Sequence, residues 1–89
     1  MTEAEFRDHL LKEGYGEAAL VEWDANTVND QHAHEFDASV FVLSGELSVT
    51  TENGDKTTCR ANDTFSLLAG RLHTEVTGAQ GVRFLAGRR

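Results

Sequence analysis

From Ala18 onward, short runs rich in β-branched and aromatic residues alternate with turn residues. Seven such runs cover residues 20–23, 40–43, 47–51, 57–59, 64–68, 72–77 and 82–85. Many short strands at this spacing are typical of an all-β sandwich or barrel. Residues 52–55 contain an Asn-Gly pair, which favours a type I′ hairpin between two of these strands. We therefore expect an all-β barrel over residues 17–89, with residues 87–89 as a solvated tail.

The first residues have helical features instead. Thr2, followed three positions later by Glu5, forms a capping box, which satisfies backbone N–H groups at the start of a helix. Gly14 is suited to the left-handed conformation that often ends a helix. The sequence predicts one helix over residues 3–13, within an N-terminal lead of residues 1–16.

The run Val40–Leu43 is apolar at every position. A strand with one face in water alternates apolar and polar residues, so both faces of this strand should be covered. Either the N-terminal helix or a second subunit can cover the outer face, and we expect a homodimer. A chain of 89 residues is also near the size at which one core gives marginal stability, so a metal or a partner would help it fold.

Charge and composition exclude several classes of function. The chain has 8 Lys and Arg against 15 Asp and Glu, a net charge of −7, which has the wrong sign for neutralising nucleic-acid phosphates. The start is acidic, unlike a signal peptide, and no apolar run is long enough to span a membrane. The single cysteine, Cys59, is consistent with a reducing compartment. We expect a cytoplasmic protein with no nucleic-acid or membrane partner.

His32 and His34 are one residue apart. On an extended strand both imidazoles would face the same side, roughly 6.5 to 7 Å apart along the backbone. Because metal–imidazole bonds are only about 2 Å long, a third ligand must come from elsewhere, and His73 is the candidate. The sequence predicts a three-histidine centre for a divalent transition metal. Iron, nickel, zinc, manganese or copper could occupy it, since occupancy follows metal availability.

The segments around these histidines resemble the two motifs of the cupin family, small jelly-roll barrels of the RmlC-like type that usually carry a central metal. The positions that match the motifs are His32, His34, Gly45, Gly70 and His73. The resemblance covers roughly residues 20–86. It implies a jelly-roll β-barrel behind the short N-terminal helix, with the three histidines as metal ligands.

The sequence departs from the cupin motifs at several positions. Asn26 and Asn62 replace two motif glycines, and asparagine is the other residue that best tolerates positive φ, so the turns should persist. Leu68 replaces the motif proline. Ala38 stands where the family has a ligating glutamate, so the resemblance implies a three-histidine variant without that carboxylate. A divalent ion would then keep a charge of about +2 and favour an anionic ligand.

Two carboxylates and four apolar residues are further candidates for the site. Asp37 has the opposite parity to the two histidines and would need a bulge to act as an additional ligand. Glu75 shares the parity of His73, so it is a candidate catalytic base or distant ligand, with a solvated glutamate as the alternative. The residues expected to line an apolar pocket are Val40, Val42, Phe65 and Phe84.

The resemblance implies a metal-dependent enzyme that acts on a small anionic organic molecule. Three-histidine iron sites among cupins belong to dioxygenases of thiols or of 1,3-dicarbonyl compounds, whose thiolates or enolates bind the metal. A metal-bound hydroxide would instead suit a hydrolase, lyase or isomerase. The alternatives are a non-catalytic module that binds a metal or small ligand, and a structural protein whose histidines are relics.

Overall fold

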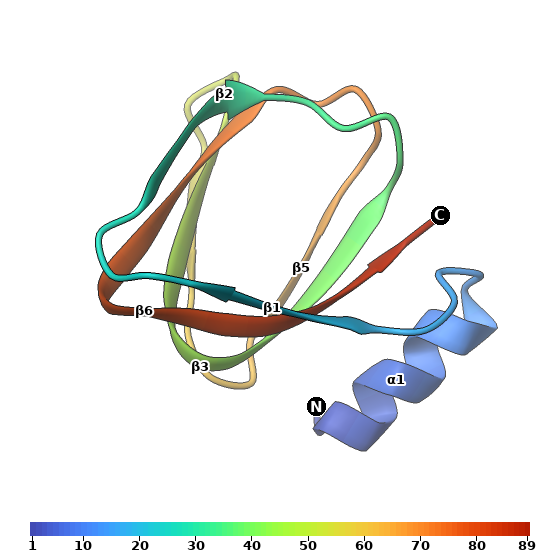
Figure 1. Cartoon of the computed structure of the whole chain (residues 1–89). Coiled ribbons are helices and arrows are strands. Elements are labelled where there is room, and N and C mark those ends of the chain that lie inside the picture. The colour runs from blue at the N-terminus through green and yellow to red at the C-terminus, as the bar shows by residue number, and fades with distance from the viewer.

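The computed structural model describes residues 1–89 and shows an antiparallel β-barrel with one helix packed on its outside (Figure 1). The elements are α1 (Glu3–Lys12), β1 (Ala19–Trp23), β2 (Val28–His32), β3 (Ala38–Thr51), β4 (Lys56–Cys59), β5 (Thr64–Leu67) and β6 (His73–Arg88). β6 pairs with β1, β2 and β3, and β3 also pairs with β4 and β5. The all-β class is confirmed. No helix here has the length and apolar character needed to cross a membrane.

β3 and β6 are longer than the sequence predicts. β3 joins the two predicted strands on either side of Gly45, and β6 joins those on either side of residues 78–81. Gly45 and Gly81 both have positive φ, 81° and 72°, and a side chain on Gly45 would collide with the carbonyl group of Gly81. The register between β3 and β6 shifts on both sides of Gly45, which marks bulges. The pattern of apolar runs predicts that the strands end at these positions. In the structure the strands continue, and the two glycines bend them.

The sequence pattern does not predict β2. Its residues are mostly polar and mostly exposed, so the strand lacks the β-branched run by which the others are recognised. β2 forms because it pairs with β6, with Val28 opposite Val76, Asn29 opposite Glu75 and His32 opposite His73. This pairing brings His32 next to His73.

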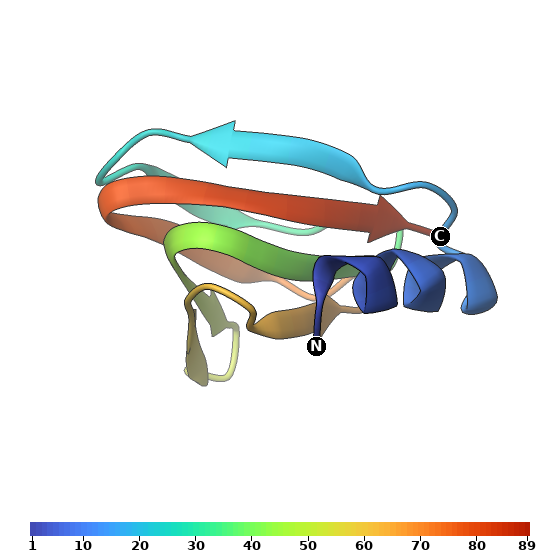
Figure 2. The same cartoon turned by 90° about the horizontal axis from the view of Figure 1, so that it is seen from below.

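The predicted helix is confirmed and ends at Lys12, one residue early. The capping box is present, because the Thr2 hydroxyl accepts from the Glu5 N–H and the Glu5 carboxylate accepts from the Thr2 N–H. Figure 2 shows α1 beside β3 on the outside of the barrel. Phe6 stacks on Phe41 with ring centroids 5.3 Å apart. The helix therefore covers the outer face of the apolar run, which removes the reason for expecting a second subunit there.

The hairpin between β3 and β4 is confirmed, but its turn type is not. Type I′ requires positive φ at both central residues, whereas Gly54 has a φ of 90° and Asn53 is not among the residues with positive φ. The turn is closed by Gly54 N–H donating to the Thr51 carbonyl and by Thr51 N–H donating to the Asp55 carbonyl, both at 2.9 Å. By contrast, Asn26 and Asn62 have the positive φ expected at the motif glycines, 54° and 72°.

Residues 87–89 are not a solvated tail. β6 continues through Arg88, and Arg89 exchanges two backbone hydrogen bonds of 3.0 Å with Asp37. The Arg89 guanidinium also pairs with the Asp37 carboxylate and lies over the ring of Tyr15. These contacts hold the end of β6 against the start of β3, beside the site described next.

Candidate metal centre

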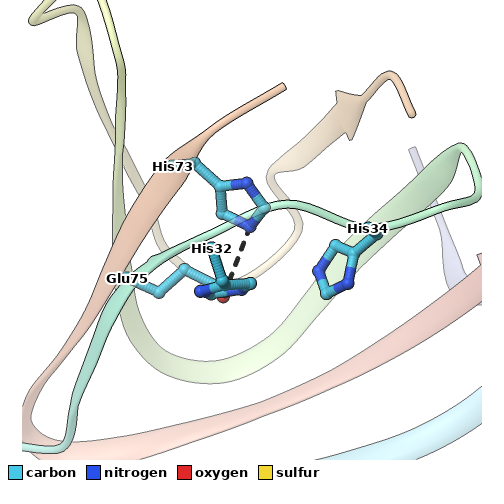
Figure 3. A group of neighbouring side chains, drawn as sticks. All are labelled: His32, His34, His73 and Glu75. Atoms are coloured by element: carbon cyan, nitrogen blue, oxygen red, sulfur yellow. Dashed lines mark ion pairs between the residues drawn. The ribbon is translucent and has the colours of Figure 1, made fainter. Parts of the chain in front are cut away.

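Four side chains converge at the end of the barrel where β2 meets β6 (Figure 3). They are His32, His34, His73 and Glu75, and one potential ligand atom from each lies within 4.8 Å of those of the other three. The imidazole centroids of His32 and His73 are 4.3 Å apart, and His34 lies 5.0 Å from the first and 5.2 Å from the second. The fold thus brings together the three histidines that the sequence analysis predicts as one site, and it adds the Glu75 carboxylate to them.

His32 and His34 reach the site from different backbone contexts. His32 is the last residue of β2, whereas His34 lies in the connection between β2 and β3, so strand alternation alone does not orient the pair. The ring of His34 stacks on Phe36 with centroids 4.7 Å apart, and its carbonyl accepts a hydrogen bond from the Gly70 N–H. Stacking and this backbone contact therefore hold His34 toward the other two imidazoles.

Backbone carbonyls fix the direction of two imidazoles. Nδ1 of His32 lies 2.7 Å from the Asp30 carbonyl, and Nδ1 of His73 lies 3.0 Å from the Arg71 carbonyl. Because a carbonyl only accepts, each Nδ1 carries the proton and donates, which leaves Nε2 of a neutral ring with a free lone pair. Hydrogen bonds of this kind orient metal-ligating histidines in many proteins.

Nε2 of His73 provides the strongest evidence in the cluster for a metal site. His73 is only 1% exposed, and this nitrogen makes no hydrogen bond. The nearest carboxylate oxygen, Oε1 of Glu75, is 3.5 Å away, too far for a good hydrogen bond. Buried polar atoms almost always have a partner, so an unpartnered nitrogen that faces three other donors points to an ion as the missing partner.

Glu75 is buried, at 7% exposure, so the alternative of a solvated glutamate is wrong. Its Oε1 lies 3.0 Å from Nε2 of His32. Ala38 still lacks a ligating side chain, but the centre does not lack a carboxylate, because β6 provides one two residues after His73. A divalent ion held by three neutral imidazoles and one carboxylate would carry a net charge of about +1, compared with the +2 of a three-histidine set.

The four residues fit a divalent transition metal. Metal–nitrogen and metal–oxygen bonds of about 2.0 to 2.2 Å place two ligands of one ion at most about 4.3 Å apart. A set spread over 4.8 Å needs only a small contraction to reach that spacing. The pKa of His34 is lowered, first by burial and then by the positive charges that His73, His32 and Arg88 can carry. His34 is therefore neutral near pH 7, the state in which an imidazole donates a lone pair to a metal.

An apolar cavity of about 610 Å³ adjoins the cluster. Of the four predicted pocket residues, Val40, Phe65 and Phe84 line it. Val42 does not, because it lies further along β3, fully buried in the packed part of the barrel interior. The cavity is therefore lined by three residues of the cluster, His32, His34 and Glu75, and does not reach Val42.

Asp37 lies outside the four-residue cluster. Its carboxylate accepts a 2.8 Å hydrogen bond from the Ala69 N–H and pairs with Arg89 at 3.3 Å. These two contacts, the hydrogen bond first, lower the pKa of Asp37. The contacts of Asp37 thus tie β3 to its neighbours and do not support its role as an additional ligand.

Sequence reasoning missed Arg88 as a cavity residue. Its guanidinium carbon lies 4.5 Å from the centre of the Phe36 ring, and both residues line the cavity. Strand alternation could have identified it, because Phe84, Ala86 and Arg88 have the same parity on β6 and all face the cavity.

No protein-family model matches this sequence, and neither does any curated protein. Solved structures do match. An RmlC-like cupin from Shewanella frigidimarina is 22% identical with a TM-score of 0.68, and the match covers 81% of this chain and 64% of that chain. A cupin superfamily protein from Desulfitobacterium hafniense is 17% identical with a TM-score of 0.69, covering 81% and 64%.

KdgF from a Halomonas species is 24% identical with a TM-score of 0.67, and the match covers 81% of this chain and 66% of that chain. The chain thus spans slightly less than two thirds of the length of these three structures. At this level of identity the similarity concerns the fold. Its antiparallel barrel, its histidine cluster and these matches show that the chain has the RmlC-like cupin jelly-roll fold.

Proposed function

We propose that this chain is a metal-dependent cupin enzyme whose substrate is a small anionic organic molecule. His32, His34, His73 and Glu75 would hold a divalent transition metal. The observation that carries the proposal is Nε2 of His73, which is buried, without a hydrogen-bond partner and directed at the other three donors. When bound, the metal would supply Lewis acidity and an open coordination position for an anion.

The reaction class that we favour is an Fe²⁺ dioxygenase of the thiol or 1,3-dicarbonyl type. The remaining charge of about +1 still favours a thiolate or an enolate over a neutral ligand. A largely apolar cavity of about 610 Å³ is within the usual range for small-molecule sites. Its lining residues Val40, Phe65 and Phe84 would exclude water from the reacting atoms.

The alternative is a non-catalytic module that binds a metal or a small ligand, and the two possible roles of Glu75 bear on it. As a ligand, Glu75 is not free to move a proton. The only other acidic residue that lines the cavity is Asp30, which is exposed. A centre in which Glu75 binds the metal therefore offers no buried general base, which suits a binding module or a reaction that needs none.

Metal content tests the proposal directly. We expect one ion per chain after anaerobic reconstitution with iron, nickel, zinc, manganese or copper, as measured by elemental analysis. Oxygen uptake by the iron form with a panel of thiols and 1,3-diketones then separates an oxygenase from a binding module. Failure to retain any of the five metals would contradict both the enzyme and the metal-binding module.

Glu75→Gln tests the assignment of the carboxylate. Glutamine keeps the size of the side chain and removes its charge, so we expect metal affinity to fall by at least about 10-fold if Glu75 is a ligand. Glu22→Gln makes the same charge change on an exposed residue of β1 paired with Arg83, and should leave the affinity unchanged. Unchanged metal affinity in Glu75→Gln together with lost turnover would instead make Glu75 the catalytic base.

A further inference from the structure

Arg88 and Ala38 lie side by side on the cavity wall. They are direct partners in the register of β6 and β3, and both line the cavity. The preceding pair, Asp37 and Arg89, exchanges both backbone hydrogen bonds. In an antiparallel ladder the next pair is then of the non-hydrogen-bonded kind, in which facing side chains are closest. The stem of Arg88 therefore runs next to a methyl group at the position where the cupin motif has a glutamate.

Arg88 carries a charge that nothing in the protein neutralises. It makes no ion pair, whereas Arg83 and Arg89 on either side of it pair with Glu22 and Asp37. It is also the only lysine or arginine among the residues that line the cavity. Its guanidinium lies on the ring of Phe36, which stacks in turn on His34. An exposed, unpaired guanidinium thus lies at the cavity, one aromatic ring away from the metal centre.

We propose that Arg88 binds a carboxylate of the substrate while the metal centre binds the other end of the same molecule. The inference rests on the proposed function and narrows its substrate class to a small organic acid that also carries a thiolate or an enolate. A guanidinium presents paired N–H groups that match a carboxylate. Alanine at position 38 leaves the guanidinium without an internal carboxylate beside it, so a carboxylate of the substrate can take that place.

The probes are mercaptocarboxylates with two to four carbons and their uncharged amides, titrated into the Co²⁺-loaded protein. Binding is followed by the thiolate-to-cobalt absorption band. With the acid of best-fitting length, we expect the parent to bind the acid at least about 10-fold more tightly than the amide, as a charge-assisted hydrogen bond allows. Arg88→Gln should abolish this preference while amide affinity and cobalt content stay unchanged.

A control variant makes the test specific. Arg83→Gln makes the same charge change on the same strand at a residue that does not line the cavity, and should keep the preference.

The possible failures are distinguishable. A parent that holds cobalt and binds acid and amide equally at every chain length overturns the role of Arg88 and leaves the metal centre standing. Loss of cobalt from Arg88→Gln, but not from Arg83→Gln, would make Arg88 a structural residue and would also overturn the inference. A parent that holds no cobalt overturns this inference, and a parent that also holds none of the five metals tested above overturns the proposed function as well.

Discussion

His73→Ala should lower metal affinity by at least about 100-fold. Loss of residues that only orient a ligand costs 10- to 100-fold, so loss of a ligand should cost no less. Nε2 of His73 is fully buried between the other donors, and no further His, Cys, Asp or Glu joins the cluster to replace it. Competition with a colorimetric chelator measures the affinity, and elemental analysis measures the metal that survives purification.

His9→Ala is the matched control for this variant. His9 lies on α1, outside the cluster, so its removal should leave metal affinity at the parent value. Equal affinities for His73→Ala and the parent would show that any bound metal lies elsewhere. Equal losses in the two variants would show that histidine removal acts through stability rather than through ligation.

Phe6→Ala should destabilise the protein by about 3 to 5 kcal/mol, the usual cost of truncating a buried phenylalanine. Phe6 is 1% exposed and stacks on Phe41, with Leu10, Tyr15 and Leu85 in the same cluster. Since domains of this kind are stable by about 5 to 15 kcal/mol, the loss would be a large share of the total. Denaturant unfolding with a chelator present measures it without the contribution of bound metal.

Leu11→Ala separates packing from helix propensity. Leu11 is on the same helix but is 63% exposed, so its truncation should cost less than about 0.5 kcal/mol. A loss below about 1 kcal/mol for Phe6→Ala would mean that α1 does not cover β3 in solution. A second subunit would then again be needed to cover the apolar run that contains Phe41.

Features with a local physical cause were predictable from the sequence. The capping box at Thr2 and Glu5 requires only residues three positions apart, and the positive φ at Asn26 and Asn62 requires only the tolerance of asparagine for that conformation. The grouping of the three histidines was predictable because the cupin motifs link positions that are distant in the chain. For Val42, strand parity predicts correctly that the side chain faces the barrel interior. Parity does not predict where along the strand the cavity ends, and Val42 lies beyond it.

Features that depend on pairing between distant strands were not predictable. β2 has no apolar pattern of its own, and its pairing with β6 is what creates it. Parity placed Glu75 on the same side as His73, but its burial depends on Asn29 and His32 of β2 lying opposite. The pairing of β2 with β6 therefore brings Glu75 to the centre, and no local pattern around Ala38 predicts that carboxylate.

The central place of β6 also bears on how the protein is made. Its partners include β1 and β2, whose residues are synthesised much earlier, so the contacts that close the barrel join residues far apart in sequence. Chains dominated by such contacts fold slowly for their size. During synthesis, neither the barrel nor the complete ligand set can exist before residues 73–88 have left the ribosome. Metal loading should consequently follow the synthesis of β6. Until then, the strands that pair with β6 would remain unfolded.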